Sequence, residues 1–419
     1  MFVFLFRSLP GSRRIVGSLA SLFALCLTPH AQAGLTFDET SRLARDQAPA
    51  LLAQQSALAG ARSLQGSATT LPDPRLIVGV DNLPVTGPDR YSLTRDFMTM
   101  QRIGLMQEVP NRAKREAREA GAQARVERER AMLAVVQLAV QRDATLGWLA
   151  AYYAERRVAQ LNELQRENQL LQDTLDARIA AGRAMPAERT MARQEALALA
   201  DRRDDALRDV TKARAALRRW VGARADEALE GDAPALAVSP EQVRASLHSH
   251  AEIAPYTAMQ AQAQAELREA DAEQRGDWGW ELIYSRRPQY SDMVSFQFTF
   301  DLPWQREQRQ KPQVLARQKD AERIDAEREE TMRRHREELE AQLAELQALE
   351  SQQARLAGSG LSLAAERVAL ALASYQAGRG DLGAVLAARR EALDTRLRLI
   401  DLETQRSALL VRLTTLVEQ

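Results

Sequence analysis

The sequence is poor in cysteine, glycine, proline and aromatic residues, and each shortage excludes a class of protein. Among 419 residues there are one cysteine, 20 glycines and 15 prolines, and aromatic residues make up 5%. A lone cysteine excludes a disulfide framework or a thiolate metal cluster within the chain. Lys+Arg and Asp+Glu both number 57, so the formal net charge is zero. The chain therefore lacks the basic excess typical of nucleic-acid binding, and we expect no nucleic-acid partner.

Alanine, leucine, arginine, glutamate and glutamine fill long tracts instead, which is the composition of long helices. We find no nucleophile elbow, no glycine loop that would hold a phosphate and no paired-histidine zinc motif. The sequence therefore predicts a mainly α protein with a small β part. We expect neither an enzyme nor a bound cofactor.

Residues 1–33 have the pattern of a secretory signal peptide. Arginines at 7, 13 and 14 precede the apolar run Ile15 to Leu27, and Ala31-Gln32-Ala33 is a small-x-small cleavage site. The apolar start, Met1 to Phe6, leaves an uncleaved anchor as an alternative, and lipidation of Cys26 is a second one. No later segment approaches the apolar length of a spanning helix, so a membrane crossing requires strands closed into a barrel.

The chain contains an internal repeat, which predicts one architecture used twice. Ala181-Gly182-Arg183 aligns without a gap to Ala377-Gly378-Arg379, and the residues that follow match at several positions. Upstream, Glu108-Val109-Pro110 matches Asp301-Leu302-Pro303 at the end of an alternating run. We therefore divide the mature chain into a first repeat at 34–222, a linker at 223–238 and a second repeat at 239–419.

Each repeat is predicted to contain a broken helix, two strands, a very long helix, a tight turn and a shorter returning helix. The strands are expected at about 75–80, 97–109, 278–286 and 293–302, and the long helices at about 111–181 and 305–377. In each half, the two shorter helices together match the length of the long one. We expect each long helix to lie beside a stacked pair of short ones.

The fourth predicted strand has the clearest functional pattern. Its apolar residues alternate strictly with Ser295, Gln297, Thr299 and Asp301, and they are Val294, Phe296, Phe298, Phe300 and Leu302. Such alternation over about ten residues is typical of a transmembrane barrel strand with one face toward lipid. A small soluble sheet packed on the helices is the alternative. Four strands are fewer than the roughly eight that close a barrel, so membrane insertion requires oligomers.

Metal-binding patterns are weak. His248 and His250 lie two residues apart at a helix end, without a nearby acidic or cysteine cluster, and His335 lies far along the chain. Met98, Met100 and Met106 offer soft thioether ligands, but the first two are expected to share a strand face as ordinary packing. We predict no metal site.

Together, the repeated segments resemble the TolC family of outer-membrane factors. The strand-to-helix junctions, 104–110 and 298–303, carry this resemblance, and so do the turns at 181–183 and 375–378. Gln47-Ala48-Pro49-Ala50-Leu51 is similar to the family's early Asn-Pro-Glu-Leu stretch, with the first and third residues changed. The resemblance covers essentially the whole mature chain.

The resemblance implies a homotrimer with a twelve-stranded barrel in the outer membrane and a long helical barrel across the periplasm. Its partners would be a periplasmic adaptor and an inner-membrane pump of the RND type, and it would conduct exported substrate passively. The compact loops look most like the heavy-metal cation efflux branch. Channels for drugs or for type I secretion are the alternative within the family.

The resemblance also places the periplasmic tips at Gly182 and Gly378. The family's aspartate ring falls on alanines, Ala384 and Ala387, so the nearest gate candidates are Tyr375 and Asp381. Asp381 is equally well explained as a helix cap. Outside the family, a soluble periplasmic coiled-coil scaffold and the adaptor subunit itself are rival interpretations, although an adaptor would carry one helical hairpin and this chain carries two.

Overall fold

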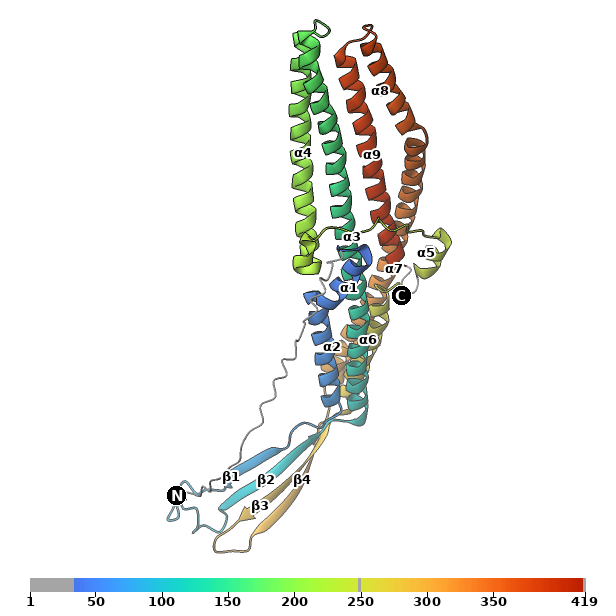
Figure 1. The fold of residues 1–419 in the computed structure, drawn as a ribbon. Coiled ribbons are helices and arrows are strands. Elements are labelled where there is room, and N and C mark those ends of the chain that lie inside the picture. The colour runs from blue at the N-terminus through green and yellow to red at the C-terminus, as the bar shows by residue number, and fades with distance from the viewer. Residues whose placement is uncertain (1–33, 248–249, 417–419) are drawn as a thin grey trace, which may run out of the picture.

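The computed structural model describes residues 34–247 and 250–416, so the predicted signal peptide and His248 lie outside the described residues. The molecule is elongated, with a long helical body and a sheet that projects from one end of it (Figure 1). The two helical hairpins point away from the sheet and form the opposite end.

The first half follows the predicted order of elements. Its helices and strands are α1 (Phe37–Gln47), α2 (Pro49–Ser67), β1 (Arg75–Asp81), β2 (Met100–Val109), α3 (Arg112–Ala180), α4 (Pro186–Val221) and the short η1 (Gly222–Asp226). Pro49 occupies the first helical position of α2, which is the restart that the sequence predicted.

The second half repeats this order with more interruptions. Its elements are α5 (Pro240–Ser246), α6 (Ala254–Ala272), η3 (Glu273–Arg275), β3 (Trp278–Arg286), β4 (Met293–Phe300), η4 (Arg306–Gln310), α7 (Lys311–Arg355), η5 (Leu356–Gly360), α8 (Leu361–Gln376) and α9 (Leu382–Thr415). The segments η4 and η5 are π-helical, so α7 and α8 form one long helix with irregular turns. Strand β4 ends at Phe300, and the prediction that Leu302 belongs to it is wrong.

Side chains cap the N-termini of α1, α3 and α9. The Thr36 side chain accepts a hydrogen bond from the Glu39 amide at 3.2 Å and so caps the start of α1. The Glu39 carboxylate pairs with Arg224 of η1. Asn111 caps α3, and Asp381 caps α9. These caps fix where the long helices begin.

The other helices of the first half pack along helix α3. Its 69 residues correspond to a length of about 100 Å. It packs against α1, α2 and α6 toward the sheet and against α4 toward the tip, and α7–α8 has α6 and α9 beside it in the same way (Figure 1). This is the arrangement of stacked short helices beside a long one that the helix lengths predicted.

One helix differs from the sequence prediction in its hydropathy. The continuous helix Arg306–Gln376 contains an 18-residue window with a mean hydropathy of 1.3, which passes the length and composition test for a membrane span. The prediction that no segment after the signal peptide is apolar enough to span a membrane is therefore wrong, by the test of length and composition. None of this window is buried within the chain.

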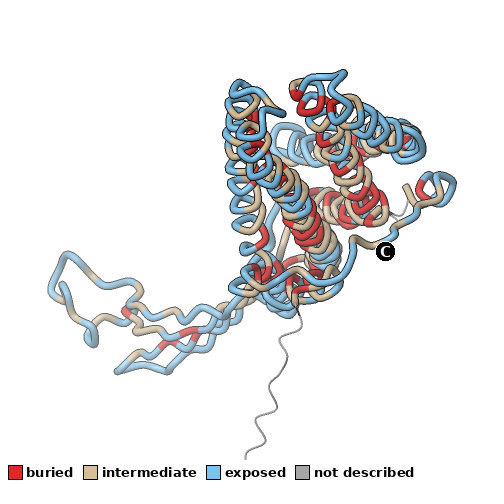
Figure 2. Tube along the Cα trace, turned by 45° about the horizontal axis from the view of Figure 1, so that its top comes forward, coloured by how far each residue is buried: buried red, intermediate tan, exposed pale blue. Residues whose placement is uncertain are grey.

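The four strands form one antiparallel sheet in the order β1-β2-β3-β4. The β2–β3 pair joins the two halves of the chain, with Leu105 opposite Leu282 and Val109 opposite Trp278. Buried positions concentrate where helices face one another, whereas the sheet is largely exposed (Figure 2). The hydrophobic core therefore lies in the helical body.

The centre of this core is Trp148 on α3, which is completely buried. Its indole Nε1 donates to the Leu35 carbonyl oxygen at 2.8 Å. Its ring stacks on Tyr152 at a centroid distance of 5.1 Å and meets the edge of Phe37 at 5.6 Å. One side chain thus ties the start of the described chain to the middle of α3.

We expect Trp148→Ala to lower the free energy of unfolding by about 3–5 kcal/mol, because it leaves a cavity and removes a buried hydrogen bond. Trp304→Ala is the matched control, since Trp304 is 87% exposed. Thermal unfolding followed by far-ultraviolet circular dichroism measures the difference. Equal melting midpoints for the two variants would contradict this account of the core.

Candidate functional site

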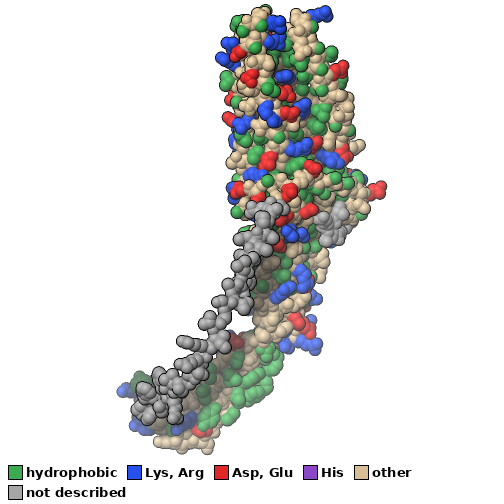
Figure 3. Space-filling model, viewed as in Figure 1, with side chains coloured by type: hydrophobic (Ala, Val, Ile, Leu, Met, Phe, Trp, Pro, Cys, Tyr) green, Lys and Arg blue, Asp and Glu red, His purple; other side chains and the backbone are tan. Residues whose placement is uncertain are grey.

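One face of the sheet is apolar across all four strands. The registers align Val78, Ile103, Tyr284 and Val294 in one row and Leu76, Leu105, Leu282 and Phe296 in the next. We call this the apolar sheet face, and its exposed members are Leu76, Val78, Val80, Ile103, Leu105, Trp278, Leu282, Tyr284, Val294, Phe296, Phe298 and Phe300. They range from 39% exposed at Trp278 to 71% at Val78. The hydrophobic side chains gather visibly over the sheet, whereas charged groups are scattered over the helical body (Figure 3).

The opposite face of the sheet is mostly polar or small, apart from Ile77, Met106 and Ile283. In β4 it carries Ser295, Gln297 and Thr299, and in β1 and β2 it carries an ion pair between Asp81 and Arg102 with a 3.2 Å N–O distance. The register places Gly104 on this face. A larger residue would be crowded there, because a Cβ would lie 3.0 Å from the Ile283 side chain. The alternation predicted for β4 therefore extends to all four strands, including β1, where it was hidden in an apolar run.

The methionines do not form a cluster on a strand. Strand β2 begins at Met100, so the prediction that Met98 and Met100 share a strand face is wrong. Met98 precedes the strand and is 47% exposed. Met106 lies on the polar face, six residues along β2 from Met100.

The junction of the sheet with α3 depends on Asn111 and Asp277. The backbone N–H of Asn111 donates to Asp277 Oδ1 at 2.8 Å. The side-chain Nδ2 of Asn111 donates to the Ala272 carbonyl oxygen at 3.0 Å. Asn111 Oδ1 accepts from the Lys114 amide at 2.9 Å, and Lys114 Nζ lies 3.1 Å from Asp277 Oδ2. These bonds fasten the first turn of α3 to the residue that precedes β3.

Burial alone would raise the pKa of Asp277, but the hydrogen bonds from Asn111 and the ion pair with Lys114 outweigh it, so the pKa is lowered. The sequence reasoning missed both Asn111 and Asp277. An asparagine directly after Pro110 and before a helical pattern was the available signal for a cap.

The predicted junction residues surround this network. Pro110 is buried directly before Asn111, and Glu108 pairs with Arg75 at 3.2 Å. Asp301 is exposed, and its amide donates to the Asp277 carbonyl at 2.9 Å, while Pro303 is half-buried two residues later. Gly276 is required beside them, because its φ is +67° and a Cβ would lie 2.1 Å from the Asp301 carbonyl oxygen. The two junctions thus meet at one place.

The two hairpin tips have the same backbone geometry. Gly182 and Gly378 have φ values of +67° and +70°. In each tip the following arginine amide reaches back to the carbonyl five residues earlier, from Arg183 to Arg178 at 2.8 Å and from Arg379 to Ser374 at 3.0 Å. This is a glycine-terminated Schellman turn at both tips, so the duplicated Ala-Gly-Arg sequence encodes a duplicated turn.

The two gate candidates lie close to the second tip. Tyr375 is 7% exposed, its hydroxyl donates to the Glu188 carboxylate of α4, and Arg178 of α3 lies over its ring at 4.6 Å. Burial, together with the bond to Glu188, raises the pKa of Tyr375 to about 12. Asp381 Oδ1 accepts from the Ala384 amide at 2.7 Å, so its carboxylate caps α9.

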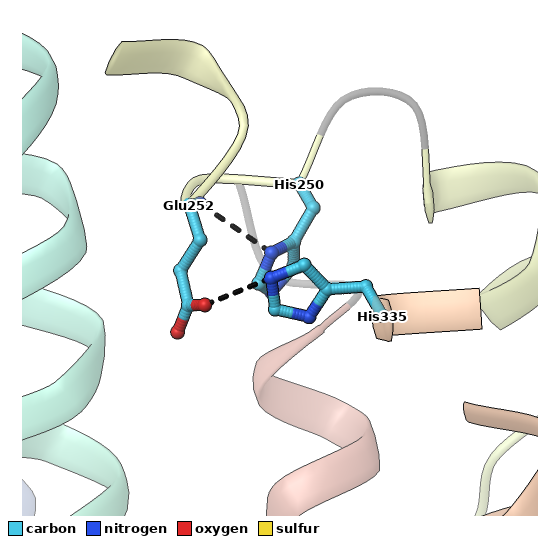
Figure 4. Close-up of side chains that lie close together, drawn as sticks. All are labelled: His250, Glu252 and His335. Carbon is cyan, nitrogen blue, oxygen red and sulfur yellow. Dashed lines mark hydrogen bonds and ion pairs between the residues drawn. The ribbon is translucent and has the colours of Figure 1, made fainter. Parts of the chain in front are cut away.

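A second cluster joins His250, Glu252 and His335 (Figure 4). The sequence reasoning found no acidic group near His250, but Glu252 lies two residues on and α7 brings His335 to a ring-centroid distance of 5.0 Å. Glu252 Oε2 lies 2.9 Å from His335 Nε2, and the Glu252 amide donates to His250 Nδ1 at 3.4 Å. Burial lowers the pKa of His250, against the opposing effect of Glu252.

No protein-family model and no curated protein matches the sequence. Solved structures match its fold. The outer membrane protein VceC from Vibrio cholerae has a TM-score of 0.75 and 16% identity, over 91% of this chain and 96% of that one. The Campylobacter jejuni CmeC outer membrane channel has a TM-score of 0.76 and 12% identity, over 97% and 94%. CusC has a TM-score of 0.73 and 16% identity, over 97% and 98%.

These likenesses span nearly the whole of each chain. The protein therefore has the fold of the TolC-type outer membrane channels, which the resemblance in its sequence predicted. At identities of 12–16%, these likenesses establish the fold alone.

The junction network yields a prediction for Asp277. We expect Asp277→Ala to lower the free energy of unfolding by about 1.5–3 kcal/mol at neutral pH, because hydrogen bonds to a charged group are lost. The pKa of Asp277 is lowered in the folded state, so its contribution is present above the ordinary aspartate pKa of roughly 3.9 and is lost as the pH falls below it.

Thermal melts of the wild type and the variant from neutral to acidic pH test this expectation. Asp271→Ala is the control, because Asp271 is an exposed aspartate near the end of α6. The gap between wild type and Asp277→Ala should narrow toward acidic pH. A gap that stays constant across this range would show that the carboxylate charge is not what stabilises the junction.

Proposed function

We propose that this protein is the outer membrane channel of a tripartite efflux system of the RND type. It would cross the outer membrane through its sheet and the periplasm through its helices, and it would conduct exported substrate without chemistry of its own. The observation that carries the proposal is the apolar sheet face, which is exposed on all four strands and has no cover among residues 34–247 and 250–416. An exposed apolar face opposite a polar one is what a barrel wall between lipid and water requires.

The proposed assembly is a homotrimer. The sheet has open edges at β1 and β4, and four strands are fewer than the roughly eight needed to close a barrel. Three copies would pair β4 of one with β1 of the next. The exposed leucines of α8, Leu363 at 62% and Leu370 at 64%, support further contact between copies along the helices.

The proposed path enters at the hairpin tips and leaves through the barrel. A periplasmic adaptor would contact the tips at Gly182 and Gly378 and connect them to an inner-membrane pump, which supplies the energy. Tyr375 bonds to Glu188 and packs under Arg178, so it ties α8 to α3 and α4 at the point where the tips must separate. We propose that opening breaks this contact. Asp381 is a weaker gate candidate because its carboxylate already caps α9.

Heavy-metal cations are the proposed substrate class. The support for this choice is the resemblance of the compact loops and of the second strand to the heavy-metal branch. The methionines add no further support, because Met98 lies outside β2. The proposed location is the outer membrane, after removal of residues 1–33 as a signal peptide.

Membrane insertion gives a sharp prediction for β4. We expect Phe298→Arg to block assembly, because arginine on the lipid face of a barrel costs about 2–4 kcal/mol per chain near the bilayer midplane. Gln297→Arg is the matched control, since it adds the same charge on the opposite face of the same strand. The readout is the amount of heat-resistant oligomer in the outer membrane fraction.

Normal assembly of both arginine variants would contradict the barrel proposal. Release of the wild-type protein from membranes by salt alone would point to a soluble scaffold instead.

Deletion of the gene tests the function itself. We expect the deletion strain to lose tolerance to copper, silver, zinc, cobalt or cadmium while keeping its tolerance to dyes and antibiotics. Wild-type protein and Gln297→Arg should restore growth, and Phe298→Arg should not. Sensitivity to dyes and antibiotics alone would overturn the metal assignment but keep the channel proposal.

A further inference from the structure

We propose that His250, Glu252 and His335 form a resident binding site for a divalent transition-metal ion of the zinc type. The site lies in the middle of the helical body, where the segment before α6 meets α7. It is independent of the exported substrate, because a resident ion would serve the structure of the channel wall whatever passes through the pore.

The geometry fits three ligands around one ion. One potential ligand atom from each of the three residues lies within 4.8 Å of the other two. Tetrahedral zinc with bonds of about 2.1 Å separates its ligand atoms by roughly 3.4 Å. The pair formed by Glu252 Oε2 and His335 Nε2 is already at 2.9 Å. Binding an ion would widen this pair by about 0.5 Å and bring the three ligand atoms toward equal separations.

The bonding of His335 independently indicates a missing ligand. Its side chain is 10% exposed, and its Nε2 atom is buried with no hydrogen-bond partner. Its polar neighbour is the Glu252 carboxylate at 2.9 Å, an ion pair that falls outside hydrogen-bond geometry. Buried polar atoms in folded proteins are almost always paired, and a cation shared by this nitrogen and the Glu252 carboxylate would satisfy both.

The surroundings of the cluster suit a bound cation. Glu338 Oε2 lies 3.8 Å from His335 Nδ1, on the side away from the proposed ion, where a carboxylate commonly orients a metal-binding histidine. The cluster opens into a cavity of about 300 Å³, which has room for a water as the fourth ligand. Asp143, Glu252 and Glu338 line it against Arg142 and Arg412, and Arg142 pairs with Asp143 at 2.9 Å.

The donor set selects the class of metal. Two imidazoles and one carboxylate suit Zn²⁺ and neighbouring divalent ions such as Co²⁺. Calcium and magnesium prefer oxygen ligands, and monovalent copper or silver prefers sulfur, so neither group fits this site. The predicted ion is therefore distinguishable from a soft metal passing through the channel.

The bound ion would add to contacts that already join this region to α7, such as the Arg244–Glu340 ion pair at 2.7 Å and the Tyr256–Thr331 hydrogen bond at 3.0 Å. His250 and Glu252 belong to the connection between α5 and α6, whereas His335 comes from the middle of α7. A shared metal would hold this connection against the long helix (Figure 4). The site would thus be a clamp that a chelator can release.

Zinc binding to the purified full-length protein tests the proposal. The protein carries no polyhistidine tag, is kept in detergent and is stripped with a chelator before titration with Zn²⁺. We expect one zinc per chain and a rise in the melting midpoint on zinc addition. His250→Ala, Glu252→Gln and His335→Ala should each weaken zinc binding more than 10-fold and abolish that rise.

Two further variants distinguish ligands from bystanders. Glu338→Gln should weaken binding by about 10-fold, as the loss of an orienting carboxylate does. Glu337→Gln removes the neighbouring exposed carboxylate on the same helix and should bind zinc as the wild type does. If His335→Ala does not fold, His335→Gln is used in its place, because glutamine is close to histidine in size.

Cobalt gives an independent readout of coordination. Co²⁺ added to the stripped wild type should produce the visible absorption of a four-coordinate site, and His335→Gln should not. Equal zinc binding by wild type and His335→Gln, or no binding by the wild type, would overturn the metal site. Neither result affects the proposed export function, because the measurement involves no transport.

Discussion

An apolar sheet face that the described part of the chain leaves uncovered is the constraint on which the rest of the structure depends. Twelve exposed apolar side chains on one face cannot stay in water without a partner surface. The helices do not cover that face, because they continue away from the end of the sheet (Figure 1). The helical body therefore has its own core around Trp148, whereas in the proposed trimer the sheet would be covered by lipid and by other copies.

The junction between these two parts connects both halves of the chain. Strands β2 and β3 pair across the repeat boundary, and Asn111 and Asp277 bond to each other from the two halves. The α3 cap, the turn at Gly276 and the start of β3 thus share one set of hydrogen bonds. The start of α3 and the start of β3 are therefore held together by the same hydrogen bonds.

The sequence predicted local features well, because they depend on short periodicities and turn chemistry. The break in the first helix at Pro49 and the two glycine tips follow from neighbouring residues alone. The ends of β2 and β4 were placed two or three residues too far out, because alternation continues past the last paired residue. The β1 alternation was hidden, since Ile77 interrupts its polar face.

Contacts between distant residues could not be predicted in this way. His335 lies 85 positions from His250, and only the packing of α7 beside the connection before α6 brings their rings together. Asp277 reaches Asn111 across 166 positions. The sequence contains the donors and acceptors of these networks, but their partners follow from the topology.

The π-helical segment η5 has a consequence for the outer surface of the molecule. A π turn holds an extra residue, and each residue of an α-helix advances by about 100°. The side chains of α8 are therefore rotated by roughly a quarter turn from where an uninterrupted helix would present them, whereas α3 is α-helical throughout. The two hairpins, although built in the same order, display unlike flanks. A ring of such chains would carry furrows of two alternating kinds, so an encircling protein would meet two different docking grooves.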